Sequence, residues 1–506
     1  MKKILLFWLL LAAIPFAFCQ NDLKRGPDIW LRADRSSESR SWSDVSGNGR
    51  DGVWSKFTED RDGGLINFNP SYRVERENGL IFSDLPVLHS QATVLIVYQI
   101  DDPSREYGLW SLRLSEEKSI GLTSHRIIGD NSEISYADLS EKGTIINSLS
   151  QSWKSNASAA LLQVGVNGEF DFEGKIAEFI YFNSTLPDEE LFRWASYLAV
   201  KYGVTLHQSP YYDSDGTIVW DYDRQKEHSF SISGLGHDSG FGLEQRQTYA
   251  CDGKMVIGLG RYSPTNRGNK ETMQDGDYIM FGSKTESSLE QDEIYTAQGE
   301  RLVSYGNIMM QATGMNSAAY SSFLQVDASG WEGPYENYYL LIDRSGSGNF
   351  SSGEIEYYQP LRVAEGILYY EDIHWDTDGN GKDIFCFAYV DSENTENEIR
   401  NYVQKNGNRN GRHSDDENFP GFEGSETSRY VLYPNPTAGH YTLKVHYPEA
   451  RPLVVKIYTA DGKLMKSFTG EGQSDYEFDD YVSTKGHYLF EIESGSEKKS
   501  LKMIVH

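Results

Sequence analysis

The chain has 506 residues and a formal net charge of −28 at pH 7, with 47 glycines and 33 tyrosines. Phosphate groups would repel so acidic a chain, which argues against nucleic acid and an anionic membrane surface as partners. The length predicts about three domains, and this glycine and tyrosine content favours turn-rich β structure over helices.

Residues 1–19 have the pattern of a secretory signal peptide. Lys2 and Lys3 precede an apolar run from Ile4 to Phe18 that is too short to cross a bilayer as a helix. Cys19 is a small residue in position for cleavage before Gln20. No later segment approaches the roughly 18 consecutive apolar residues of a membrane helix, so we expect no transmembrane segment in the mature chain.

Residues 20–207 are predicted to form an antiparallel β-sandwich. Short apolar or alternating runs separated by turn residues are typical of such folds. The runs are Thr93–Tyr98, Tyr107–Leu112, Leu161–Val166 and Lys175–Phe182.

One helix, between Thr185 and Gly203, is predicted to close this sandwich. Thr185 is suited to cap it, Pro187 fits its first turn, and Gly203 is placed to end it. An apolar stripe at helical spacing follows the same segment: Leu191, Trp194, Ala195, Leu198 and Tyr202. A stripe of this composition indicates core packing and not a ligand site.

Three segments of this region carry a resemblance to a known family. They are Trp42-x-Asp-x-Ser-Gly-Asn-Gly, Asn67–Pro70 and Ile176–Phe182. Together they resemble the concanavalin A-like (laminin-G-like) jelly-roll domains of bacterial surface proteins. The resemblance implies a lectin-like jelly roll.

Residues 208–390 are predicted to form a second β-rich domain. Asp213–Trp220, Ile232–Asp238 and Val256–Gly260 resemble a domain without assigned function that follows the jelly roll in the same proteins. His237 departs from that pattern, which has arginine there.

Residues 391–428 are predicted to be a flexible linker, because they are rich in Asn, Glu, Asp and Gly and poor in large apolar side chains. Residues 429–506 then resemble the type A C-terminal sorting domain of the type IX secretion system of Bacteroidetes-type bacteria. The resemblance rests on Tyr433–Gly439, an Asp-Gly turn after Ile457, the segment Lys485–Ile492 and the basic-apolar end Leu501–His506.

The sorting domain implies an immunoglobulin-like β-sandwich and contact with the type IX secretion machinery. It also implies transport through the periplasm to the outer cell surface or the medium, either with release or with attachment to lipopolysaccharide. The whole chain is thus expected to be a multidomain all-β protein.

The best candidate for a metal site is the loop Asp376-Thr-Asp-Gly-Asn-Gly-Lys-Asp383. Its oxygen-bearing side chains at Asp376, Asp378, Asn380 and Asp383 approach the ligand set of a structural Ca²⁺ ion. The alternative is that Asp-Gly-Asn-Gly is simply favourable hairpin chemistry. A second, weaker candidate loop has a similar spacing of oxygen-bearing side chains, at Asp343, Ser345, Ser347 and Asn349.

The two cysteines of the mature chain leave their pairing open. Cys251 and Cys386 could form one disulfide in an oxidising compartment. Alternatively, Cys386 could lie buried on one strand face with Ile384, Ala388 and Val390.

No catalytic signature is present in the sequence: there is no His-Glu-x-x-His and no Gly-x-Ser-x-Gly. The leading hypothesis is therefore a non-enzymatic binding or adhesion protein for a carbohydrate or matrix ligand, with calcium-stabilised loops. The alternatives are an extracellular glycan-degrading enzyme and a purely structural scaffold of a surface layer or biofilm. Five tryptophans could stack on sugars or belong to cores: Trp54, Trp110, Trp153, Trp331 and Trp375.

Overall fold

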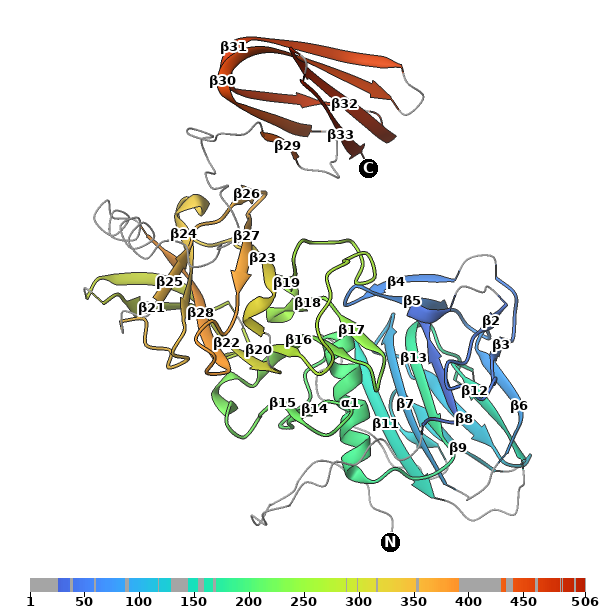
Figure 1. Ribbon diagram of the computed structural model, residues 1–506. Coiled ribbons are helices and arrows are strands. Elements are labelled where there is room, and N and C mark those ends of the chain that lie inside the picture. The colour runs from blue at the N-terminus through green and yellow to red at the C-terminus, as the bar shows by residue number, and fades with distance from the viewer. Residues whose placement is uncertain are drawn as a thin grey trace. The chain divides into compact units, whose positions relative to one another are not determined.

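The protein is described from a computed structural model (Figure 1). It describes residues 26–390 and 429–505, apart from gaps at 37–39, 59–60, 87–90, 117, 129–143, 153–158, 167–169, 288, 298, 315–316, 352–354, 434–439, 460–462, 483, 485 and 496. The predicted signal peptide and the predicted linker lie outside the described residues. The chain divides into two compact units, residues 1–410 and residues 411–506. The fold is all-β and multidomain, as predicted.

The first part of unit 1 is a sandwich of two antiparallel sheets. In the described residues one sheet has six strands: β1 (Ile29–Arg32), β4 (Asp62–Ile66), β5 (Asn69–Val74), β7 (Gln91–Ile100), β11 (Ile145–Ser152) and β13 (Gly174–Phe182). The other has seven: β2 (Ser41–Trp42), β3 (Gly52–Trp54), β6 (Leu80–Pro86), β8 (Gly108–Arg113), β9 (Ser119–Thr123), β10 (Ile127–Ile128) and β12 (Ala159–Val164). The four predicted strands correspond to β7, β8, β12 and β13.

Strand β13 is buried on both faces. Phe179 and Tyr181 point into the core between the two sheets, whereas Ile180 and Phe182 point to the opposite side. A bulge between Ile176 and Glu178 shifts the alternation at the start of the strand. The outer face of this sheet therefore also needs an apolar partner.

That partner includes helix α1 (Asp188–Tyr202), the one α-helix among the described residues. Trp194 and Leu198 pack in the same cluster as Ile180, so the predicted docking of the helix is confirmed. Gly203 ends the helix in the left-handed conformation with φ 65°, also as predicted.

The predicted cap of this helix is wrong. Helix α1 begins at Asp188 after Pro187, and within the described part of the chain no side chain caps its first turn. The hydroxyl group of Thr185 donates to Gln91 instead, 3.2 Å away. Thr185 is thus held by strand β7 and lies too far before the helix to bond its first amides.

The second part of unit 1 stacks two further antiparallel sheets. In the described residues one has eight strands: β16 (Phe230–Asp238), β17 (Leu243–Gln245), β20 (Tyr278–Ser283), β21 (Gln291–Tyr295), β22 (Arg301–Thr313), β24 (Tyr338–Asp343), β25 (Ile355–Tyr358) and β28 (Lys382–Tyr389). The other has five: β18 (Gln247–Ala250), β19 (Met255–Leu259), β23 (Ser321–Asp327), β26 (Arg362–Ala364) and β27 (Ile367–His374). A short hairpin, β14 (Tyr211–Tyr212) and β15 (Ile218–Trp220), precedes them. The short 3₁₀ helices of unit 1 are η1 (Ala33–Arg35), η2 (Lys226–His228), η3 (Cys251–Gly253), η4 (Ser317–Ala319) and η5 (Tyr335–Asn337).

The two parts of unit 1 share one hydrophobic cluster. It joins Leu95 and Ile180 of the sandwich, Trp194 and Leu198 of helix α1, and Cys386 of strand β28. In Figure 1 the helix lies between strands β7, β11 and β13 on one side and β14 to β17 on the other. Residues on both sides of the predicted boundary at 207/208 therefore contribute to a common core.

The alternation predicted around Cys386 is confirmed. Ile384, Cys386, Ala388 and Val390 all lie in this shared cluster, while Phe385 faces the core between the two sheets of the second part. Cys251 lies in that other core and Cys386 carries a free thiol, so the two are not joined in a disulfide. Burial raises the pKa of the Cys386 thiol above its ordinary value.

In unit 2 the described strands form one five-stranded antiparallel sheet, and its apolar side chains make a separate hydrophobic core. The strands are β29 (Arg429–Tyr433), β30 (His440–Thr459), β31 (Leu464–Tyr481), β32 (Gly486–Ser494) and β33 (Glu497–Val505). The pairing of β30 with β31 shifts register between His446 and Leu453. No helix in the described part of the chain is long and apolar enough to cross a membrane.

Candidate functional site

The two loops predicted to bind calcium lie side by side. Strand β24 ends at Asp343, strand β28 begins at Lys382, and the two strands pair with Asp343 opposite Ile384. Asn380 donates to the main-chain carbonyl of Arg344 over 2.8 Å, which ties one loop to the other. The structure thus brings together two segments more than 30 residues apart in the sequence.

Each predicted ligand side chain of the loop 376–383 is bonded within the protein, although one oxygen of Asp383 accepts no hydrogen bond from a described residue. Asp376 accepts from the main-chain N–H of Gly381 (2.6 Å) and from the hydroxyl of Ser317 (3.1 Å). Asp378 accepts from the side-chain amide of Asn380 over 2.7 Å. Asp383 accepts from the main-chain N–H of Asp376 over 2.8 Å. These bonds hold a tight turn.

A guanidinium group supplies the positive charge that a calcium ion would otherwise provide. Arg344 is buried, donates to Asp383 over 2.9 Å and bonds Glu356 as well. Burial raises the pKa of Asp383, whose other oxygen has no hydrogen-bond partner among the described residues. Within the described residues no group of three or more acidic, histidine or cysteine side chains is arranged to hold a metal ion. Calcium binding here stays a prediction that this arrangement does not favour.

The weaker loop is closed on itself in the same way. Asp343 is fully buried and accepts from the hydroxyls of Ser345 (2.6 Å) and Ser347 (3.0 Å). Asn349 accepts from Ser351 over 2.6 Å. The side chains of all four predicted ligands of this loop are thus bonded within or next to the loop.

The tryptophans proposed as sugar platforms are mostly core residues. Trp54, Trp110 and Trp375 are buried, and Trp331 is half-buried and stacks on Tyr305. Trp153 lies outside the described residues. The four described tryptophans therefore belong mainly to the hydrophobic cores.

A buried polar network at the junction of the two parts of unit 1 was not predicted from the sequence. Its centre is Glu178 of strand β13, which has no exposed surface. One carboxylate oxygen accepts from Trp30 (2.6 Å) and Tyr197 (2.8 Å), and the other from Lys201 and Tyr202 (2.8 Å each). Burial, with a further contribution from the charge of Glu178, raises the pKa of both tyrosines well above the ordinary value.

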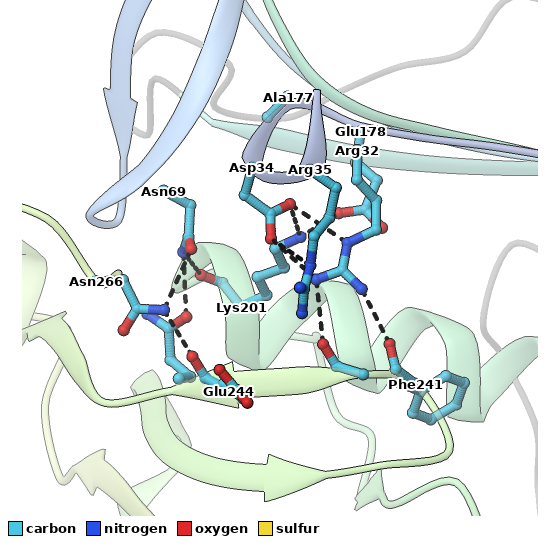
Figure 2. A network of polar contacts seen from close by, with 12 residues as sticks. Arg32, Asp34, Arg35, Asn69, Ala177, Glu178, Lys201, Phe241, Glu244 and Asn266 are labelled. Atoms are coloured by element: carbon cyan, nitrogen blue, oxygen red, sulfur yellow. Dashed lines mark hydrogen bonds and ion pairs between the residues drawn. The ribbon is translucent and has the colours of Figure 1, made fainter. Parts of the chain in front are cut away.

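The network extends to Asp34 and Arg32 at the end of strand β1 (Figure 2). Lys201 donates to Asp34 over 2.7 Å, and Arg32 donates to the same carboxylate over 3.0 Å. Burial alone would raise the pKa of Asp34, but these two cations hold it well below the ordinary value. Arg32 also donates to the carbonyls of Phe241 (3.2 Å) and Gly242 (3.1 Å), which connect β16 to β17. One side chain thus bonds both parts of unit 1.

The hairpin between β4 and β5 makes a second connection. Asn67 and Phe68 at its tip both have positive φ, 47° and 66°, the conformation that Asn readily adopts and Phe seldom does. The side-chain amide of Asn67 donates to the carbonyl of Lys201 (3.1 Å) and accepts from the N–H of Tyr249 (2.8 Å). Phe68 stacks on Tyr249 with ring centroids 4.4 Å apart. The segment Asn67–Pro70 is therefore an interface hairpin.

A cavity of about 660 Å³ opens beside these contacts. Its walls come from η1, the β4–β5 hairpin and helix α1 on one side, and from strand β17 and the loop after β19 on the other. Asn266 of that loop bonds Asn69 (3.4 Å) and the carbonyl of Glu244 (2.6 Å), as Figure 2 shows. We call this cavity the interdomain cleft.

The residues of the network gave only a weak signal in the sequence. Glu178 is the charged residue in the otherwise apolar segment Ile176–Phe182, and Lys201 lies next to the apolar stripe of the helix. On so acidic a chain, a single carboxylate more often faces solvent than a core. The burial of Glu178 follows from the burial of both faces of β13, which the sequence alone does not show.

Two family models match the sequence. Residues 190–380 match a domain of unknown function (DUF8202), and residues 431–506 match a secretion system C-terminal sorting domain. No curated protein matches the chain.

Likenesses to solved structures are weak. A Trypanosoma rangeli sialidase shares 12% identity over 32% of this chain, with a TM-score of 0.25. Latent PorU from Porphyromonas gingivalis shares 12% identity, covering 89% of this chain and 33% of its own, with a TM-score of 0.16. The chain spans about a third of the sialidase (31%), and TM-scores this low establish no common fold. The C-terminal match alone identifies the chain as cargo of the type IX secretion system, exported to the cell surface or the medium.

Proposed function

We propose that the exported protein binds a glycan or matrix polysaccharide in the interdomain cleft, without turning it over. The cleft is the observation that carries this proposal. Its volume of about 660 Å³ and its position at a junction between two folded parts are typical of ligand sites.

The walls of the cleft are held in place before any ligand arrives. The buried network connects helix α1, strand β13 and the β16–β17 connection through Glu178, Lys201 and Arg32. A preorganised site loses less conformational freedom on binding and so retains more of its interaction energy.

Binding is favoured over hydrolysis because of the state of the innermost carboxylate. Glycoside hydrolysis needs one carboxylic acid that keeps its proton near neutral pH. The pKa of Asp34 is shifted in the opposite direction, and Glu244 is paired with Arg246 at 2.7 Å.

A glycan array with the purified mature protein tests the proposal. A bulky substitution in the cleft wall, Ser36→Trp, should abolish binding that the wild type shows. The matched control is Ser115→Trp, at an exposed position that does not line the cleft, and it should bind as the wild type does. Absence of glycan binding by the wild type, or equal binding by Ser36→Trp, would overturn the proposal.

A further inference from the structure

The interdomain cleft has a charge opposite in sign to that of the chain. Although the chain carries −28, six basic side chains and only three acidic ones line the cleft. The basic residues are Arg32, Arg35, Arg61, Lys201, Arg246 and Arg267, and the acidic ones are Asp34, Asp62 and Glu244. Concave surfaces lined by one sign of charge concentrate the local field.

The innermost charges balance one another. Lys201 bonds both Asp34 and Glu178, and Arg32 bonds Asp34 as well. Two cations thus face two carboxylates in a buried group that holds the fold together. The charge available to a ligand therefore comes from the outer part of the cleft.

Two exposed arginines lie on opposite walls of that outer part. Arg35 is in η1 of the sandwich, and its side chain is 51% exposed. It lies 3.8 Å from the carboxylate of Asp34, which already accepts three hydrogen bonds from Arg32 and Lys201. Arg267 lies in the loop after β19, is exposed, and forms no ion pair with any described residue. Arg246 stands near them on strand β17's side of the cleft, paired with Glu244.

The loop that carries Arg267 is fixed to the opposite wall. The N–H of Asn266, its direct neighbour, donates to the carbonyl of Phe68 over 2.8 Å. The side chain of Asn266 accepts from the N–H of Arg246 over 2.8 Å. The position of Arg267 beside the cleft is therefore set by two hydrogen bonds of its neighbour Asn266, one through the main-chain N–H and one through the side chain.

We infer that the ligand of the interdomain cleft is an acidic saccharide, one that carries carboxylate or sulfate groups. This inference rests on the proposed function. Guanidinium groups bind carboxylate and sulfate oxygens through paired, charge-assisted hydrogen bonds. Arginines on two walls would add little binding energy for a neutral glycan. An acidic glycan is repelled by the negative charge of the chain as a whole, so it can bind only where positive side chains gather.

Matched polymers test this inference. Binding of the mature protein is measured by calorimetry to dextran sulfate and unmodified dextran, and to oligogalacturonate and its methyl ester. The acidic member of at least one pair should bind, its neutral partner should bind at least about tenfold more weakly, and added salt should weaken the binding.

The double variant Arg35→Gln/Arg267→Gln should lose at least about tenfold in affinity for the acidic polymer. Its matched control is Arg224→Gln/Arg301→Gln, which removes the same charge at two exposed positions outside the cleft and should bind as the wild type does. Tryptophan fluorescence checks that both variants are folded.

The outcomes separate the inference from the proposed function. Equal binding of neutral and acidic glycans in the cleft would overturn the inference and leave the proposed function standing. Equal losses in the two double variants would mean general charge attraction and would also overturn it. No binding to any saccharide would overturn both.

Discussion

Replacing Glu178 by glutamine tests whether the buried network holds the two parts of unit 1 together. The carboxylate accepts four hydrogen bonds and balances Lys201 in a place without solvent. The amide nitrogen of a glutamine would face two of these four donors, and Asp34 would be the one anion left to Lys201 among the described residues. Breaking a buried ion pair from one side costs about 3–5 kcal/mol, and we expect a loss of that size in the free energy of unfolding.

The assay is chemical denaturation followed by tryptophan fluorescence. All tryptophans of the mature chain precede residue 376, so the signal reports unit 1 and not the sorting domain. The control is Glu77→Gln, which removes an exposed carboxylate paired with Lys56 and should leave the stability unchanged. In a double-mutant cycle, Lys201→Met should offset part of the loss caused by Glu178→Gln. A loss below about 1 kcal/mol for Glu178→Gln would refute the assigned role of the network.

Four further outcomes are expected. The pKa of Asp34 is depressed in the folded protein, so its carboxylate stabilises the fold at pH values above the ordinary pKa of 3.8. This contribution is lost as the pH falls further. The stability difference between the wild type and Asp34→Asn, measured by urea unfolding, should therefore shrink between about pH 5 and pH 2. Asn67→Ala should cost about 2 kcal/mol of unfolding free energy, because it leaves the carbonyl of Lys201 and the N–H of Tyr249 without that partner; an unchanged denaturation midpoint would contradict the interface role of the hairpin. Calcium chloride and EDTA should both leave the thermal unfolding temperature unchanged, because Arg344 already neutralises Asp383; a rise with calcium that Asp376→Asn abolishes would instead support the calcium site predicted from the sequence. A chain ending at residue 428 should accumulate in the periplasm, as fractionation and immunoblotting would show, and normal export of that chain would contradict the role of the sorting domain.

Regular periodicity was sufficient to predict much of the fold. The stripe of helix α1, its end at Gly203 and the single-face placement of Cys386 all follow from spacing along the chain. The sorting domain was recognisable because its motifs occur together over a short segment.

The candidate site could not be predicted because it depends on residues far apart in the sequence. The spacing of Asp376 and Asp383 resembles a calcium loop, but Arg344, in the turn after strand β24, bonds Asp383. The bulge beside Glu178 depends on pairing with β7 and gives no pattern that the sequence shows. The cleft itself exists only where the β4–β5 hairpin meets the loop of Asn266.

Strand β13 has a consequence for the way this protein can evolve and be produced. Its outer side chains are covered by helix α1 and by residues that follow in the chain as far as Val390. A fragment that ends soon after the helix would expose part of this apolar sheet face to solvent and should therefore aggregate. Expression fragments and gene fusions are therefore expected to fold only if they contain the whole of unit 1. Evolution would have to move this unit between genes as one piece.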